Sequence, residues 1–210
     1  MGENMSGSSI LIATKNKHKA GELAALLSSL AEVMNLSDWE SSTGKVLDEP
    51  DENGLTFQAN ALIKSRQYAQ ATGLITLADD SGLSVEALGG APGVLSARYG
   101  GPGLNDDDRC ELLLKSLAGH HDRRAFFTSV LSLSRPDGAS LVWEGRAEGL
   151  ISREKRGGNG FGYDPVFYFP PCRKTFAELG ASEKNEVSHR ARASRFFMDD
   201  ISKVRRFVAG

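Results

Sequence analysis

An α/β fold is predicted by two apolar runs and the helical pattern that follows the first of them. Residues 9–14 indicate a strand, apolar from Ile10 to Ala13, and leucines from Leu23 to Leu30 then recur at the i, i+3, i+4, i+7 spacing of an amphipathic helix. Residues 74–78 form a second short apolar run behind Gly73, which is typical of a strand covered on both faces. Strands that alternate with helices indicate a sheet with helices packed against it.

Three further helices are predicted from their boundary residues. The first extends from Thr56 to Gly73, because glycine commonly stops a helix at its C-terminal end. The second covers residues 106–117 and has an apolar side. The third follows Ser188, a good N-cap residue, and its inward positions continue to Val204.

A β-hairpin is predicted in the second half of the chain. Residues 125–134 and 139–147 are rich in residues that favour strands, and the segment between them contains Pro136 and Gly138. Cys110 lies on the apolar side of the helix predicted at 106–117, so we expect a core residue rather than a nucleophile.

Length and composition limit the class of protein. A chain of 210 residues can bury a substantial core, and we expect a loose tail over residues 1–8 and a single domain over residues 9–210. The net charge of -2 offers no broad basic field for nucleic acid. No apolar run approaches the roughly 20 residues of a membrane helix, and the two cysteines fit no metal spacing. We therefore expect a cytoplasmic protein without nucleic-acid or membrane partners.

Two adjacent carboxylates, Asp79 and Asp80, follow the apolar run at 74–78 and are expected in a turn at the carboxyl end of a buried strand. In open α/β sheets, ligands bind at that rim. Asp, Ser and Gly also favour ordinary polar turns, which leaves a purely structural turn open. Because alternate residues of an extended stretch face opposite ways, we expect Asp79 to turn inward and Asp80 to reach a ligand.

Four basic side chains crowd the start of the first predicted helix, where Lys15, Lys17, His18 and Lys19 surround Asn16. Asn16 is a candidate N-cap. A helix start already carries partial positive charge, so the basic groups are unfavourable there unless an anion binds. Backbone N–H groups and lysines together make a phosphate site. Lysines solvated on a surface loop are the alternative.

An acidic segment before Thr56 is a candidate source of metal ligands. It contains Asp48, Glu49, Asp51 and Glu52. Hard cations such as Mg²⁺ take carboxylate oxygens, so one of these acids is expected to join Asp80. A solvated acidic loop is the alternative.

A glycine-rich segment, residues 156–165, surrounds Phe161 and Tyr163 with four glycines. Glycines let the backbone approach a ligand, and the aromatic rings offer faces on which a nucleobase stacks. A second basic helix start follows at His189 and Arg190. The segment is therefore a candidate base-binding loop.

Seven segments in order, from about residue 10 to about residue 205, resemble the inosine/xanthosine triphosphate pyrophosphatase family. They are Thr14 to Lys19, Gly54-x-Thr56-Phe57-x-x-Asn60-Ala61, Ala78-Asp79-Asp80-Ser81-Gly82-Leu83, Gly89-Gly90-x-Pro92-Gly93, Ser96-Ala97-Arg98-Tyr99, Gly160-Phe161-Gly162-Tyr163-Asp164-Pro165 and Ser188-His189-Arg190. The resemblance implies an α/β fold with an elongated mixed β-sheet, flanking helices and two lobes around a central substrate cleft. It also implies a soluble homodimer that uses Mg²⁺ to cleave dITP, ITP and XTP to monophosphate and pyrophosphate. Such an enzyme cleanses the nucleotide pool and keeps these bases out of DNA and RNA.

The resemblance also implies roles for individual residues. Asp80 matches the proton acceptor and metal ligand, and Asp51-Glu52 align with the family's second acidic metal position, which leaves open whether Asp51, Glu52 or Glu49 reaches the metal. Lys15 stands where many members have glycine. Candidate substrate-binding residues, with Lys64 of the helix after Thr56 added to them, are Thr14, Lys15, Asn16, Lys17, His18, Lys19, Lys64, Ser81, Phe161, Gly162, Tyr163, Asp164, Lys184, His189 and Arg190.

The reaction makes chemical demands that these residue types meet. Attack of water on a phosphorus surrounded by negative oxygens needs charge neutralisation, which lysines, helix N-termini and Mg²⁺ provide. Asp80 is expected to hold the ion and accept a proton from the attacking water. A related enzyme for pyrimidine or modified nucleotides, and a nucleotide-binding protein without catalysis, are the alternatives.

Overall fold

The computed structural model describes residues 9–210, apart from the side chains of Lys17, His18 and Glu22. The tail expected over residues 1–8 lies outside the described residues. Backbone contacts divide the chain into two compact units. Unit 1 holds the chain up to Asp80, Val130–Glu144 and Ser194–Gly210, and unit 2 holds Ser81–Ser129 and Gly145–Ala193. The single domain expected over residues 9–210 stays a prediction.

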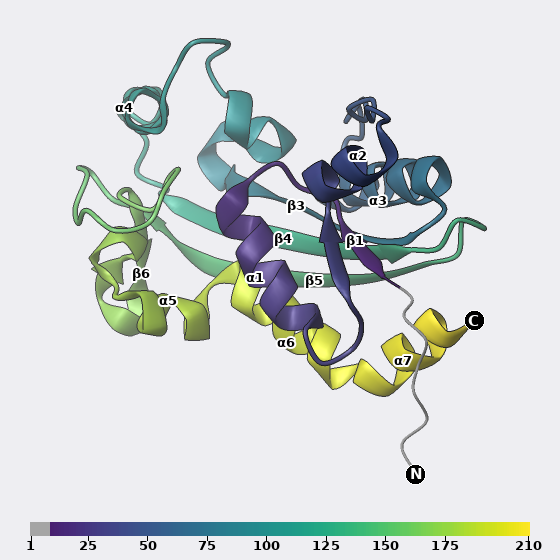
Figure 1. The fold of residues 1–210 in the computed structure, drawn as a ribbon. Coiled ribbons are helices and arrows are strands. Elements are labelled where there is room, and N and C mark those ends of the chain that lie inside the picture. Colours follow the sequence, from purple (N-terminus) through teal and green to yellow (C-terminus); the bar gives the residue numbers. More distant parts are fainter. Residues whose placement is uncertain (1–8) are drawn as a thin grey trace. The chain divides into compact units, whose positions relative to one another are not determined.

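The described strands form one mixed sheet in the order β2-β1-β3-β4-β5-β6-β7 (Figure 1). β1 pairs in parallel with both of its neighbours, whereas β6 pairs antiparallel with β5 and β7. The predicted α/β fold, a mixed sheet with flanking helices, is confirmed. The strands are β1 Ile10–Ile12, β2 Val33–Asn35, β3 Ile75–Val85, β4 Arg124–Ser134, β5 Ser140–Ile151, β6 Phe167–Phe169 and β7 Lys174–Thr175.

The helices begin and end largely where their capping residues predict. They are α1 Lys17–Leu27, α2 Leu36–Thr43, α3 Phe57–Thr72, α4 Asp106–Ser116, α5 Ala181–Val187, α6 His189–Asp199 and α7 Ile201–Ala209. Thr56 caps α3 by accepting a hydrogen bond from the Ala59 N–H, and Gly73 ends it with a φ of 73°. Ser188 caps α6 by accepting from the Ala191 N–H at 3.2 Å. No helix within residues 9–210 is long and apolar enough to cross a membrane.

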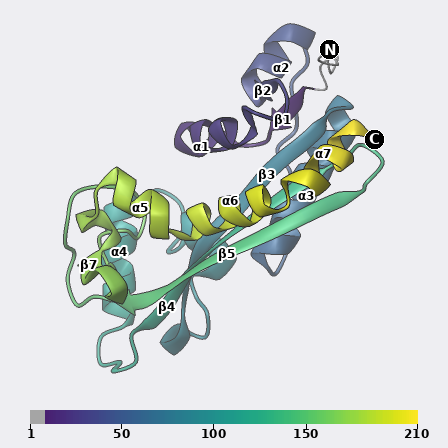
Figure 2. The ribbon, with the colours of Figure 1, turned by 90° about the horizontal axis from the view of Figure 1, so that it is seen from below.

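In unit 1, α1 packs against β1 and β2, and α2 packs against β2 (Figure 2). α3 is held to β4 by buried hydroxyl groups, since the Ser65 Oγ lies 2.8 Å from that of Ser132 and 2.7 Å from that of Ser134. Buried hydroxyls are stable when they find such partners. The contact fixes the helix that carries Lys64, the residue before Ser65.

Unit 2 is built around an aromatic core. The Phe127 ring lies 4.7 Å from that of Phe167 and 5.9 Å from that of Phe176, between ring centroids. α4 joins this core through Cys110 and Leu113, which are both fully buried. The predicted hairpin is confirmed, since β4 and β5 are neighbours in the sheet and the Arg135 N–H donates to the Ala139 carbonyl across the turn. β5 continues beyond the expected end at Ala147, to Ile151.

The turn expected at Asp79 and Asp80 is wrong, because β3 continues through both residues to Val85. The parallel pairing of β1 with β3 ends at Ile12 and Leu77. β3 has β4 as its other neighbour, and sheet pairing there outweighs the local turn preference of Asp, Ser and Gly. The two acids therefore lie just beyond the parallel pairing with β1, inside a strand.

The C-terminal helix expected to continue from Ser188 to Val204 is also wrong, because it is broken at Asp200. The Asp200 carboxylate accepts a hydrogen bond from the Trp143 indole N–H at 3.0 Å, and its backbone carbonyl accepts from the Lys203 N–H. These long-range and local contacts begin a new helix, α7, at this point.

Candidate active site

A partly buried ion pair joins the start of α1 to β3. The Lys19 Nζ lies 2.8 Å from Asp79 Oδ2, and the Asp79 side chain is only 3% exposed. The Asn16 Oδ1 accepts from the Lys19 N–H at 3.2 Å, which confirms Asn16 as the cap of α1. The Thr14 Oγ1 in turn accepts from the Asn16 N–H at 3.2 Å. Thr14 and Asn16 therefore shape the turn from which Lys19 reaches β3.

A second lysine approaches the same stretch of β3 from α3. The Lys64 Nζ donates to the Asp79 carbonyl at 3.2 Å and pairs with Glu52 Oε1 at 3.0 Å. Glu52 is held near α3 because the Gly54 N–H donates to the Asn60 Oδ1 at 2.8 Å. A Cβ on Gly54 would lie 2.6 Å from that oxygen, so this approach requires glycine.

Asp80 lies in the same cluster, and its pKa is raised to about 6. Burial is the largest cause; the negative charges of Glu52 and Asp79 add to it, and Lys64 and Lys19 oppose it. A carboxyl group that titrates near neutral pH is suited to accept a proton during catalysis. Asp79 instead is buried and pairs with Lys19, which agrees with the expectation that it turns inward. That Asp80 reaches a ligand stays a prediction.

Of the three acids considered as partners of Asp80, Glu52 is the one whose charge raises the pKa of that residue. Glu49 pairs with Lys15 at 3.0 Å, and both side chains are exposed. The Asp51 carboxylate accepts a long contact, 3.5 Å, from the Asn53 side-chain amide. Among the described side chains, which exclude His18 and Glu22, no group of three or more His, Cys, Asp and Glu residues could hold a metal ion. Two carboxylates are enough for a hard cation, because such an ion fills its other coordination positions with water and substrate oxygens.

A cavity of about 430 Å³ adjoins the predicted phosphate-binding segment in unit 1. Thr14 and Lys15 line it together with Asn35 and Tyr68. Lys17 and His18 were also predicted to bind phosphate, but their side chains lie outside the described residues. Ser81 follows Asp80 in β3 and is half-buried.

In unit 2, the Phe161 ring is flanked by two cations. The Lys184 Nζ lies 5.1 Å from the ring centroid, and the Arg190 Cζ lies 4.7 Å from it. Asp164 accepts from the Phe161 N–H at 2.9 Å and forms a short ion pair with Lys184. A Cβ on Gly160 would meet the Asp164 carboxylate at 2.1 Å, so this loop conformation needs glycine there. The structure thus brings together Phe161, Asp164, Lys184 and Arg190, as predicted.

Two other predicted contact residues lie in the core of unit 2. Tyr163 is 5% exposed and its hydroxyl donates to the Ser96 carbonyl at 2.8 Å. His189 is 3% exposed and stacks on Phe127 with 4.7 Å between ring centroids. These contacts hold the backbone next to Tyr163 and His189 in place. That the two residues touch the substrate stays a prediction.

Sequence reasoning missed the contact of α4 with Gly162. The Gly162 N–H donates to the Asp106 carboxylate at 2.8 Å. An acid in the first turn of a helix is common for helix stability, and no local signal tied Asp106 to a loop 56 residues away.

The chain is similar to known proteins over most of its length. A sequence model of the Ham1 family matches residues 10–200. The chain is 48% identical over 185 residues to the dITP/XTP pyrophosphatase of Desulfotalea psychrophila, covering 88% of this chain and 81% of that protein. It is 47% identical over 200 residues to the protein of the same name from Syntrophobacter fumaroxidans, covering 95% and 84%. The solved structure of a HAM1 protein from Coxiella burnetii is similar with a TM-score of 0.86 and 40% identity, covering 93% of this chain and 98% of that one.

Proposed function

The chain belongs to the Ham1 family, and on that premise we propose that it hydrolyses dITP, ITP and XTP to the monophosphate and pyrophosphate. Relatives that share nearly half of its residues are named dITP/XTP pyrophosphatase. The observation that carries the proposal is the unit 1 cluster, in which Lys19 and Lys64 converge on Asp79 beside the poised carboxyl group of Asp80.

In this proposal, the unit 1 cluster acts on the triphosphate. Lys19 and Lys64 neutralise charge on the phosphate oxygens, since positioned cations stabilise the transition state of phosphoryl transfer. Asp80 accepts a proton from the attacking water, because its pKa of about 6 lets it do so near neutral pH. The products, monophosphate and pyrophosphate, require cleavage of the phosphoanhydride bond between the α- and β-phosphates.

We propose Mg²⁺ as the cofactor, held by Asp80 and Glu52. The support is the pair of neighbouring carboxylates, one partly buried, whose repulsion a cation would relieve. When bound, the ion would neutralise phosphate charge and make a coordinated water easier to deprotonate.

The base is assigned to the unit 2 residues. Phe161 is 37% exposed and offers a ring face for stacking. Lys184 is the candidate donor to the 6-oxo group of the purine. Adenine carries an amino group at that position, so a buried donor would lose its acceptor at a cost of about 1 to 3 kcal/mol. Hypoxanthine and xanthine carry the 6-oxo group. We further propose that the protein is a homodimer and acts in the cytoplasm on free nucleotides.

Product analysis tests the proposed reaction. The purified protein is incubated with Mg²⁺ and ITP, XTP, GTP or ATP, and monophosphate, pyrophosphate and orthophosphate are quantified separately. We expect monophosphate and pyrophosphate from ITP and XTP, and little from ATP or GTP. Orthophosphate with a diphosphate would mean cleavage between the β- and γ-phosphates. No turnover of the four nucleotides would favour a nucleotide-binding protein, and faster turnover of CTP, UTP or modified nucleotides, assayed in the same way, would favour the other alternative.

A further inference from the structure

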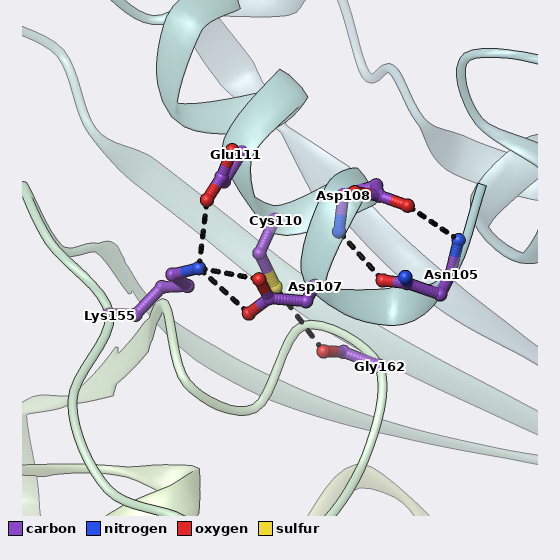
Figure 3. Close-up of polar contacts among 7 residues, drawn as sticks. All are labelled: Asn105, Asp107, Asp108, Cys110, Glu111, Lys155 and Gly162. Carbon is purple, nitrogen blue, oxygen red and sulfur yellow. Dashed lines mark hydrogen bonds and ion pairs between the residues drawn. The ribbon is translucent and has the colours of Figure 1, made fainter.

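Both backbone groups of Gly162 are held by side chains of one helix, α4. The Gly162 N–H donates to Asp106 Oδ2 at 2.8 Å. The Cys110 thiol donates to the Gly162 carbonyl at 3.3 Å, as Figure 3 shows. Asp106 and Cys110 are four residues apart, so they lie on the same side of the helix. The tip of the base-binding loop is therefore tied to α4 at a single residue.

A second contact ties the beginning of this loop to the next side of α4. The Lys155 Nζ lies 2.7 and 2.8 Å from the two carboxylate oxygens of Asp107 and 3.1 Å from Glu111 Oε1 (Figure 3). These groups are more exposed than Cys110, so the ion pairs are screened by solvent and contribute less. They nevertheless restrict the segment that leads to Phe161.

α4 is itself firmly anchored and can serve as a fixed support. Asn105 and Asp108 form a reciprocal capping box at its start, with hydrogen bonds of 3.0 and 3.1 Å (Figure 3). Cys110 and Leu113 are fully buried in the unit 2 core. Burial, the largest cause, raises the pKa of the Cys110 thiol to about 12, so the sulfur keeps the proton that it donates to Gly162.

We propose that Asp106 and Cys110 are positioning residues for base recognition and act on Phe161 through Gly162. This inference rests on the proposed function, because it takes Phe161 as the ring on which the purine stacks. Phe161 directly precedes Gly162, and its own N–H is bound by Asp164 at 2.9 Å. Two consecutive N–H groups thus have fixed carboxylate acceptors. They orient the two peptide planes on either side of the Phe161 Cα, which carries the ring.

The physical need for such anchors follows from the loop's composition. Gly157, Gly158, Gly160 and Gly162 give the backbone unusual freedom, and three of them adopt positive φ. A loop that samples many conformations would lose that freedom when the base binds, which weakens affinity. Anchoring Gly162 to α4 fixes the ring before the substrate arrives.

Asp106→Ala and Asp106→Asn form the test, with steady-state hydrolysis of ITP as the main measurement. Alanine removes the acceptor for the Gly162 N–H, whereas asparagine removes the charge but keeps an oxygen that can accept. We expect Asp106→Ala to raise KM for ITP about fivefold to tenfold with kcat within about twofold, as the loss of one hydrogen bond that orders the loop allows. Asp106→Asn should remain close to wild type.

Two further measurements separate positioning from general damage. Inhibition by inorganic pyrophosphate should be the same in all three proteins, because the unit 1 residues are unchanged. Hydrogen exchange of the peptide covering residues 156–166, without ligand, should be faster in Asp106→Ala than in Asp106→Asn. Melting temperatures of both variants that match the wild-type value would show that the fold is retained.

Three results would overturn the inference. One is an unchanged KM in Asp106→Ala when the wild type hydrolyses ITP. Another is an equal rise in KM for alanine and asparagine, which would assign the effect to charge. The third is a fall in kcat at constant KM. A wild-type protein that does not hydrolyse ITP would overturn the proposed function itself, and that result is seen before any variant is made.

Discussion

The unit 1 cluster and the base-binding loop of unit 2 are built in opposite ways. In unit 1, charged side chains extend from α1, α3 and β3, and the mostly buried pairs Lys19 with Asp79 and Lys64 with Glu52 hold one another. In unit 2, an exposed ring lies on a glycine-rich loop and is held by backbone hydrogen bonds. Regular elements suit groups that must meet a reacting phosphorus accurately, whereas a loop suits selection among bases.

The comparison makes one general prediction. Changes in the unit 1 cluster should lower kcat, because in the proposed function those groups act on the transition state. Changes in the loop should raise KM or alter base preference and leave kcat nearly intact. The following experiments test this division from the largest expected effect to the smallest.

Replacing the poised carboxyl group should have the largest effect. We expect Asp80→Asn to lower kcat for ITP by roughly 100- to 10,000-fold, the usual contribution of a general base. Binding of ITP, measured by calorimetry, should be largely kept. Asp48→Asn, a change at an exposed acid on the segment before α3, is the matched control. Near-normal turnover by Asp80→Asn would show that Asp80 is not the general base.

The second metal carboxylate can be identified by a pair of variants. Glu52→Gln should raise the Mg²⁺ concentration needed for half-maximal rate by roughly tenfold or more, because a direct ligand matters at least as much as an outer one. Asp51→Asn should change it little, since its carboxylate is exposed and weakly bound. A titration of rate against Mg²⁺ measures both. The reverse order would assign the site to Asp51.

Removing the ring in unit 2 should act on affinity alone. Phe161→Ala should weaken inosine monophosphate binding by about 1 to 3 kcal/mol if the base stacks on the ring. Phe161→Tyr keeps an aromatic face and is the control. Calorimetry with inosine monophosphate and with pyrophosphate separates the base from the phosphates. An unchanged affinity in Phe161→Ala would exclude Phe161 from base binding.

The smallest expected effect is on stability, and its sign follows from the pKa of Asp80. Folding raises this pKa from 3.8 to about 6, so the folded state holds the proton more tightly and loses stability as pH rises through that window. An asparagine side chain does not titrate, so the variant does not lose stability in this way. In the presence of EDTA, Asp80→Asn should be about 1 to 3 kcal/mol more stable than wild type at pH 8.

That advantage should disappear near pH 4, where the wild-type carboxyl group is protonated in the folded protein. Urea unfolding at both pH values measures it. A variant less stable than wild type at pH 8 would mean that the Asp80 carboxylate is stabilised, not strained, by its neighbours. The active-site cluster would then resemble an ordinary structural ion-pair network.

Helix boundaries were predictable because they depend on neighbouring residues. Asn16, Thr56 and Ser188 each cap the helix that follows, and their hydrogen bonds reach only three residues along the chain. α2 was missed because its sequence, rich in Ser and Thr, has low helix propensity, and β2 is a three-residue strand without alternation. Neighbouring elements support both in the folded chain.

Residue order alone therefore indicated the α/β class, the family and most members of the candidate site. Only the folded structure decides which charged groups lie next to one another. Whether Asp79 and Asp80 lie in a turn or in a strand depends on sheet pairing. Which other acid raises the pKa of Asp80 depends on contacts between residues far apart in sequence. The same holds for Asp106, whose partner lies 56 residues away. Local preferences are properties of short segments, whereas charge pairing and loop anchoring exist only once distant segments are packed together.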